Sequence, residues 1–195
     1  MRLGPRSTLA DVAIAVGDAL RRADIRAVLT GGACASLHSA GAYHSLDADF
    51  VLMGECAVAD LDRAMGALGF DRVRDRYVHK AVPYFVEFPA GPLGIGEDFA
   101  VRPIWKRRKL ARMLMLSATD SCRDRLAAFY HWQDRQALAA AVAIAVHERV
   151  ALPKVRRWSK AEGHPEDYKR FLAELARARR ARTAAKGGRA REPKA

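Results

Sequence analysis

The spacing of apolar residues divides the chain into a first part that contains strands and a second part that is helical. In the first part, apolar side chains at helical spacing alternate with short apolar runs that are typical of buried strands. In chain order this predicts a helix over residues 8–23, a strand over 27–30, a short helix over 33–39, a strand over 45–52, a helix over 57–68, an exposed strand pair over 70–80 and a central strand over 84–88.

From residue 117 onward the apolar positions keep a helical period. Ser117, Thr119 or Asp120 is available to cap the first of these helices. Further helices are predicted over about 134–149, 153–160 and 165–180.

The two parts together predict an α/β (α+β) fold. A small mixed sheet with flanking helices is expected over residues 1–116, and a C-terminal helical segment that packs on it over 117–182. Residues 183–195 are basic and poor in large apolar side chains, so a disordered tail is predicted there.

Two glycines and two aspartates stand out in the stretch from 27 to 52. Gly31 and Gly32 follow the first predicted strand directly, so the backbone can turn sharply there and a ligand can approach it closely. Asp47 and Asp49 are two positions apart on the next predicted strand, so both carboxylates lie on one strand face.

Paired carboxylates on one face repel each other unless they are solvated or neutralised. Mg²⁺ (or Mn²⁺) neutralises such a pair, and the first amides of a helix bind phosphates. The stretch therefore has the equipment of phosphoryl or nucleotidyl transfer. The alternative is an ordinary glycine loop followed by a solvated edge strand. It stays open because neither the glycine pair nor the aspartate pair is specific on its own.

In this order and spacing, the stretch resembles the nucleotidyltransferase superfamily with the DNA polymerase β-like fold. The signature of that superfamily is an apolar strand, Gly-Gly or Gly-Ser, a helix, and Asp-x-Asp on the next strand. The residues that match it are Gly31, Gly32, Asp47 and Asp49.

The chain is most similar to small prokaryotic branches that include abortive-infection and toxin–antitoxin nucleotidyltransferases. Those often carry Arg-x-Ser/Thr-x-Asp before the second aspartate. Ser45 and Asp47 match this pattern, whereas Tyr43 stands where the arginine would be. The resemblance implies that Asp47 and Asp49 hold Mg²⁺ on the triphosphate of an NTP. It also implies that the β- and γ-phosphates are cradled by Gly31, Gly32 and Ser45.

A third carboxylate is predicted at Glu87, within an apolar and aromatic strand where an unpaired charge is unfavourable. The resemblance implies an acid on the strand next to Asp-x-Asp that completes the metal site. Such an acid orients or deprotonates the attacking hydroxyl. The alternatives are that Glu87 pairs with a core arginine, or that Glu97 or Asp98 supplies the third acid.

Arg125, near the start of the first C-terminal helix, is the predicted phosphate ligand outside the sheet. This assignment is implied by the resemblance of the segment around it to the toxin-like branch, with Asp124 and Asp134 as further partners. The alternative is that Asp124, Arg125, Asp134 and Arg135 form ordinary ion pairs on and between helices.

Positive charge is concentrated near the C-terminus. The chain has a formal net charge of +12, and residues 151–195 contain 14 Lys and Arg against 5 Asp and Glu. Such a segment attracts phosphate, so an RNA acceptor is a predicted partner, although basic tails also simply increase solubility.

The remaining sequence features bear on the cellular setting. Cys34, Cys56 and Cys122 are widely spaced and odd in number, which predicts free thiols in a reducing cytoplasm. No apolar run approaches the roughly 20 residues of a membrane span, so no membrane partner is predicted. Asp11 and Asp18 interrupt the apolar N-terminus and favour an amphipathic helix over a signal peptide.

The predicted function is transfer of NMP from an NTP to an acceptor hydroxyl on an RNA 3′ end, a protein or a small molecule. Two other hypotheses stay open. In one, a regulatory partner protein holds a toxin-like activity in check. In the other, which Tyr43 favours, the chain is a catalytically inactive module of this fold in a protein or RNA complex.

Overall fold

Residues 2–189 are described by the computed structural model, with side chains described through residue 185. The helices are α1 (Leu9–Arg22), α2 (Gly31–His38), α3 (Val58–Gly66), α4 (Ala118–Trp132), α5 (Arg135–His147), α6 (Leu152–Ala161) and α7 (Pro165–Arg189). The strands are β1 (Ala27–Leu29), β2 (Asp47–Leu52), β3 (Phe70–Val73), β4 (Arg76–His79), β5 (Phe85–Glu87), β6 (Ile104–Arg108) and β7 (Ala111–Met115). The predicted fold class, a mixed sheet with helices, is confirmed.

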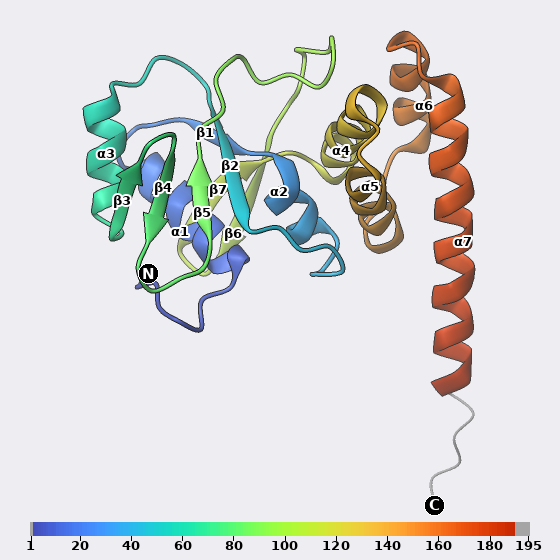
Figure 1. Ribbon diagram of the computed structural model, residues 1–195, viewed down its shortest axis with the longest axis horizontal. Coiled ribbons are helices and arrows are strands. Elements are labelled where there is room, and N and C mark those ends of the chain that lie inside the picture. The colour runs from blue at the N-terminus through green and yellow to red at the C-terminus, as the bar shows by residue number, and fades with distance from the viewer. Residues whose placement is uncertain (1, 190–195) are drawn as a thin grey trace, which may run out of the picture.

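A seven-stranded sheet in the order β3-β4-β5-β2-β1-β7-β6 forms the centre of the molecule (Figure 1). β2 pairs with β5, and β1 with β7, in parallel, whereas the other neighbours are antiparallel. The parallel pairing of β2 with β5 is important for function because it sets Asp49 beside Glu87.

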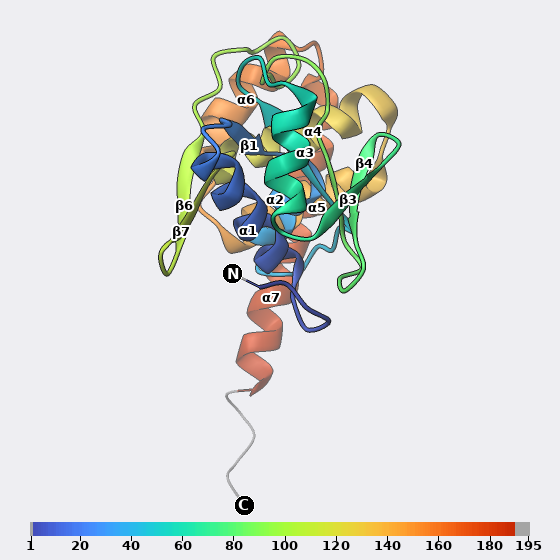
Figure 2. The ribbon, with the colours of Figure 1, turned by 90° about the vertical axis from the view of Figure 1, so that its left-hand side faces the viewer.

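The twisted sheet wraps around α1. In Figure 2, α1 lies between the β3–β4 hairpin on one side and the β6–β7 hairpin on the other. A Cβ on Gly17 would collide with the Met113 side chain, so a glycine is needed for α1 to lie this close to β7. The apolar residues of α1 therefore fill one face of the sheet, and β2 keeps its other face for polar side chains.

The helical segment is attached to the sheet through α2. Both α4 and α5 pack on α2, and α6 and α7 lie on their outer side (Figure 1). At the junction the Cys34 thiol donates to the Leu116 carbonyl at 3.7 Å, and His38 Nε2 lies 2.9 Å from the same oxygen. The predicted boundary between residues 116 and 117 falls between β7 and α4.

Side-chain caps fix where the long helices begin. Thr8 and Asp11 form a reciprocal capping box at α1. Ser117 accepts a hydrogen bond from the Asp120 amide at α4, and Asp134 caps α5 by accepting from two amides. Each cap satisfies backbone donors that the first helical turn leaves without a partner.

Helix α7 is longer than predicted. It continues to Arg189, beyond residue 183, where the predicted tail begins. Ala181, Arg182, Ala184 and Ala185 are good helix formers, whereas Gly187 and Gly188 near the end of the helix are not. Residues 190–195 of the predicted tail lie outside the described residues.

The start of α2 also differs from the expected elements. Helix α2 begins at Gly31, so the glycine pair forms its first turn and not a separate turn before it. The basic run 106–109 belongs to the β6–β7 hairpin, and β6 is an exposed edge strand. None of the helices within residues 2–189 has both the length and the apolarity that crossing a bilayer requires.

A buried arginine holds the loop before β6 and helix α6 to α4. Arg123 is 1% exposed and donates to Asp120 at 2.9 Å and to Asp98 at 2.5 Å. Lys154 of α6 also donates to Asp120 at 2.8 Å, and the Arg123 guanidinium stacks over Trp158. Burial opposes ionisation of Asp120, but these hydrogen bonds lower its pKa.

We predict that Arg123→Met destabilises the fold by about 3–5 kcal/mol, because it leaves the buried Asp120 and the partly buried Asp98 without this partner. Urea unfolding followed by circular dichroism measures this free energy. Arg177→Met is the matched control, since Arg177 forms an exposed pair with Glu174 at 3.3 Å. It should change stability by about 0.5 kcal/mol or less, and equal losses in both variants would contradict a structural role for Arg123.

Candidate metal and nucleotide site

Strands β2 and β5 place three acidic side chains on one face of the sheet. Ala48 and Phe50 are completely buried on the core side, so Asp47 and Asp49 point to the opposite face. Glu87 is in register with Asp49 on the parallel neighbour β5. Glu87 therefore lies beside the aspartate pair, as the sequence predicts.

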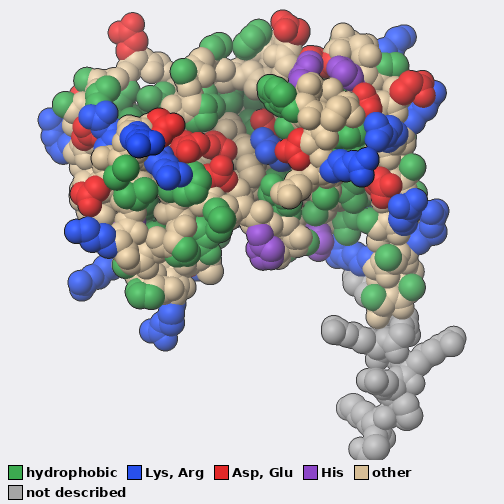
Figure 3. Space-filling model, viewed as in Figure 1, with side chains coloured by type: hydrophobic (Ala, Val, Ile, Leu, Met, Phe, Trp, Pro, Cys, Tyr) green, Lys and Arg blue, Asp and Glu red, His purple; other side chains and the backbone are tan. Residues whose placement is uncertain are grey.

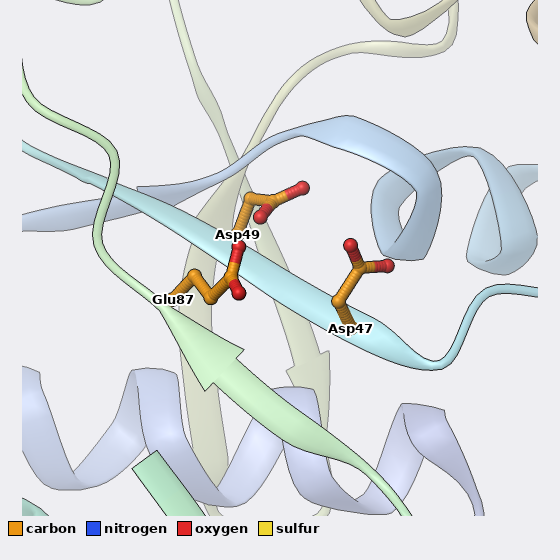
Figure 4. A group of neighbouring side chains, drawn as sticks. All are labelled: Asp47, Asp49 and Glu87. Carbon is orange, nitrogen blue, oxygen red and sulfur yellow. The ribbon is translucent and has the colours of Figure 1, made fainter. Parts of the chain in front are cut away.

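The three carboxylates form one compact group. Each offers an oxygen atom, and these atoms lie within 4.8 Å of one another (Figure 4). In Figure 3 acidic side chains gather on the sheet half of the molecule, beside a hollow in the middle of that face. The group is half-buried, so it is reachable from solvent while its charges are only partly screened.

Crowding changes the protonation of Asp49. Burial and the neighbouring charges of Asp47 and Glu87 raise the pKa of Asp49 to about 7, against an ordinary value of 3.8. The Arg125 guanidinium acts in the opposite direction. Near neutral pH, and without a bound cation, Asp49 is therefore partly protonated.

The glycine pair gives the site its shape. Gly31 has a φ of +61°, and a Cβ there would collide with the Asp49 carboxylate. A Cβ on Gly32 would lie 2.5 Å from Ser45 Oγ. Any other residue would therefore push against the acids or the hydroxyl, and glycine leaves the backbone of α2 bare beside the carboxylates.

The start of α2 offers hydrogen-bond donors at this place. Thr30, its N-cap residue, makes no side-chain capping bond, and the first turn contains no acidic residue. The first amides of a helix carry partial positive charge and bind anions. The backbone at Gly31 and Gly32 is thus suited to receive phosphate oxygens next to Asp49.

Ser45 contacts the acidic group directly. Its hydroxyl donates a hydrogen bond to Asp47 Oδ1. This contact fixes the orientation of the Asp47 carboxylate, while the predicted role of Ser45 as a phosphate ligand stays a prediction.

Arg125 reaches the acids from α4. Its side chain is 18% exposed and pairs with Asp124 at 2.8 Å. Its charge favours the ionised form of Asp49, and also that of Tyr43, whose pKa burial nonetheless raises. A cation is therefore present beside position 43, although residue 43 is a tyrosine.

The other acidic candidates take part in structural contacts elsewhere. Asp98 pairs with Arg123, and Asp134 caps α5. The Glu97 amide donates to Glu162 at 3.0 Å in the loop before β6. Among the described residues, the carboxylate group that is compact enough for a metal ion consists of Asp47, Asp49 and Glu87.

The structure also brings Arg76 and Phe85 to the site, and both residues lie outside the motif of glycines and aspartates. Arg76 on β4 is in register with Glu87, and its guanidinium stacks over Phe85 at 4.8 Å. Phe85 is in register with Asp47 on the same strand face as Glu87. The alternating arginines of the 70–80 segment were the available signal, but Arg72 pairs with Asp62, and Arg74 occupies the hairpin turn.

No protein-family model and no curated protein matches this chain. The assignment of a function therefore depends on the geometry of the site.

We predict that Asp49→Asn stabilises the metal-free fold more at high pH than at low pH. The folded state binds the Asp49 proton more tightly than the unfolded state, so wild-type stability falls as pH rises from about 4 to about 7. Asparagine lacks this penalty. In a chelator, the advantage of the variant should grow by about 1–2 kcal/mol between about pH 5 and pH 8, measured by urea unfolding.

The exposed residue Asp71 on β3 provides the matched control for this prediction. Asp71→Asn should change stability by about 0.5 kcal/mol or less at both pH values. An advantage of Asp49→Asn that is the same at both pH values would contradict the crowding of the three carboxylates.

Proposed function

We propose that the chain is a metal-dependent nucleotidyltransferase that moves NMP from an NTP to an acceptor hydroxyl. One observation carries this proposal: three carboxylates converge on one sheet face, directly beside a helix start that has no Cβ atoms. The first feature suits a divalent cation, and the second suits phosphates. Their combination suits the triphosphate of a nucleotide.

The chemistry of the donor set fits Mg²⁺ or Mn²⁺. Asp47, Asp49 and Glu87 provide hard carboxylate oxygens, and a cation among them relieves the repulsion that raises the Asp49 pKa. When bound, such an ion neutralises charge on the phosphate oxygens of the substrate. Ser45 keeps Asp47 oriented for this purpose through its hydrogen bond.

The nucleotide is held from two directions. The amides at Gly31 and Gly32 donate to the phosphates from the sheet side, and Arg125 contributes its charge from α4. The position of Arg125 near Tyr43 supports this role. The family that the chain resembles often has an arginine at the position of Tyr43, and Arg125 can supply that positive charge here.

Glu87 receives the proton in the transfer step. The acceptor oxygen forms a bond to the α-phosphorus, and the bond between the α-phosphorus and the bridging oxygen to the β-phosphate breaks, so that pyrophosphate leaves. The hydroxyl proton passes to the Glu87 carboxylate. The lack of an ion pair at Glu87 among the described side chains supports this role over the alternative of a core arginine partner.

The acceptor is an RNA 3′ end, a protein hydroxyl or a small molecule, and the platform of Arg76 on Phe85 favours RNA because it offers a base both a ring and a cation. The free cysteines support a reducing cytoplasm as the setting. A toxin-like activity checked by a regulatory partner protein remains part of this proposal.

The second candidate function is a catalytically inactive binding module. The observation that favours it is Tyr43, which stands where members of the resembling branch often have an arginine. In addition, the Ser45 hydroxyl, a predicted phosphate ligand, already donates its hydrogen bond to Asp47. This candidate requires no transfer of nucleotide and no dependence on a divalent cation, so the two functions are separable by experiment.

We predict that purified protein transfers radiolabel from α-³²P-NTPs to total RNA in the presence of Mg²⁺ or Mn²⁺. Glu87→Gln should lower the rate by about 10²–10⁴-fold because the proton acceptor is lost. The nucleotide affinity of this variant should fall far less than its rate, because Asp47 and Asp49 remain to hold the cation. Denaturing gels measure the transfer, and equilibrium dialysis measures the affinity.

Asp71→Asn is the matched control, since it removes an exposed carboxylate away from the site. It should transfer label at the wild-type rate. Absence of label on RNA, protein and small molecules with well-folded wild type would contradict the enzyme and favour the binding module.

A further inference from the structure

A basic groove runs between α6 and α7, on the outer side of the helical segment. Its cavity volume is about 820 Å³. The residues that line it are Leu152, Pro153, Arg156, Arg157, Lys160, Pro165, Tyr168, Lys169 and Leu172. The lining thus includes cations from both helices and no carboxylate.

The cations of α6 are free to bind a ligand. Arg156, Arg157 and Lys160 are exposed, and none forms an ion pair with a residue that the structure describes. By contrast, Lys169 on the opposite wall pairs with Glu166 at 2.7 Å. The unpaired charge therefore concentrates on the α6 wall.

A further cation, Arg180, lies along α7 beyond the groove. Arg180 lies 11 positions after Lys169, which is about three helical turns, so both residues lie on the same side of the helix. Lys and Arg side chains recur over this helix along the right-hand edge of Figure 3. A ligand that extends beyond the groove on this side of α7 would therefore meet Arg180 about three turns after Lys169.

The lining of the groove is mostly apolar, and its exposed charged groups are cations. Leu152, Tyr168 and Leu172 contribute apolar surface, whereas Arg156 and Arg157 are exposed. Exposed guanidinium groups match phosphate oxygens, to which each can donate two hydrogen bonds.

We propose that the α6–α7 groove binds the sugar-phosphate backbone of single-stranded RNA and thereby docks the acceptor. Its role in docking an acceptor rests on the proposed function, whereas the binding itself does not. In Figure 1 α4 and α5 stand between this groove and strands β2 and β5. The RNA is therefore longer than a few nucleotides, with its body on α6 and α7 and its end toward the carboxylates.

The test is RNA binding without nucleotide or metal. A fluorescent single-stranded RNA of about 20 nucleotides is titrated with full-length protein in EDTA at several salt concentrations, and anisotropy gives the Kd. Substitution of Arg156, Arg157 and Lys160 by Gln should weaken binding at least about 10-fold at about 100 mM salt. Loss of about three phosphate contacts should reduce the slope of log K against log salt by about 2.

The β6–β7 hairpin provides a control with the same change in charge. Lys106, Arg107 and Lys109 are exposed there, and their joint substitution by Gln should weaken binding by less than about 3-fold. An equal loss in both triple variants would overturn the proposal, because it would assign the affinity to net charge. Absence of binding by wild type would also overturn it.

Three further arms separate the possible ligands and the two proposals. Poly-glutamate that binds as tightly as the RNA would contradict a phosphate-backbone ligand, whereas single-stranded DNA of the same sequence should bind similarly, because contacts to phosphate do not depend on the sugar. The double variant Asp47→Asn/Asp49→Asn should still bind RNA, because the groove does not include these residues. If wild type binds RNA through the groove but wild type transfers no nucleotide, the groove stands and the proposed enzyme falls.

Discussion

Mutual repulsion among Asp47, Asp49 and Glu87 is the interaction on which the site depends. Three carboxylates with oxygen atoms within 4.8 Å are unfavourable in a half-buried position unless a proton or a cation joins them. The pKa of Asp49, raised to about 7 by burial and by its two neighbours, expresses this cost. Positive charge at the start of α2 and on Arg125 partly compensates this repulsion.

The scaffold holds the charges together by non-local pairing. β2 and β5 are separated in sequence by α3 and the β3–β4 hairpin, yet they pair in parallel with Asp49 opposite Glu87. The buried residues Ala48 and Phe50 lock the face of β2, since a slip of one residue would turn the aspartates into the core. Helix α2 then connects the same site to the helical segment, because α4 and α5 pack on it.

Local periodicity made part of this structure predictable. The strand period alone places Asp47 and Asp49 on one face, and turn and cap residues mark most helices. The positions of Glu87 and Arg125 depend on which distant elements meet. The sequence supports Glu87 through its charge within an apolar strand and through the resemblance to a family, and it supports Arg125 through that resemblance alone. The stacking of Arg76 on Phe85 needed the register of β4 with β5. Helix α7 extends beyond its predicted end, through a segment that contains Gly187 and Gly188, so local helix propensity alone does not set where it stops.

Binding of NTPs followed by calorimetry tests the central claim most directly. Each NTP is titrated into wild type and into Asp47→Asn/Asp49→Asn, with Mg²⁺ and with EDTA, and the fold of both proteins is checked by circular dichroism. The account predicts binding that requires Mg²⁺ and that the double variant abolishes. Absence of binding by well-folded wild type, or binding that is unchanged in EDTA and in the variant, would contradict a metal-dependent nucleotide site at the three carboxylates.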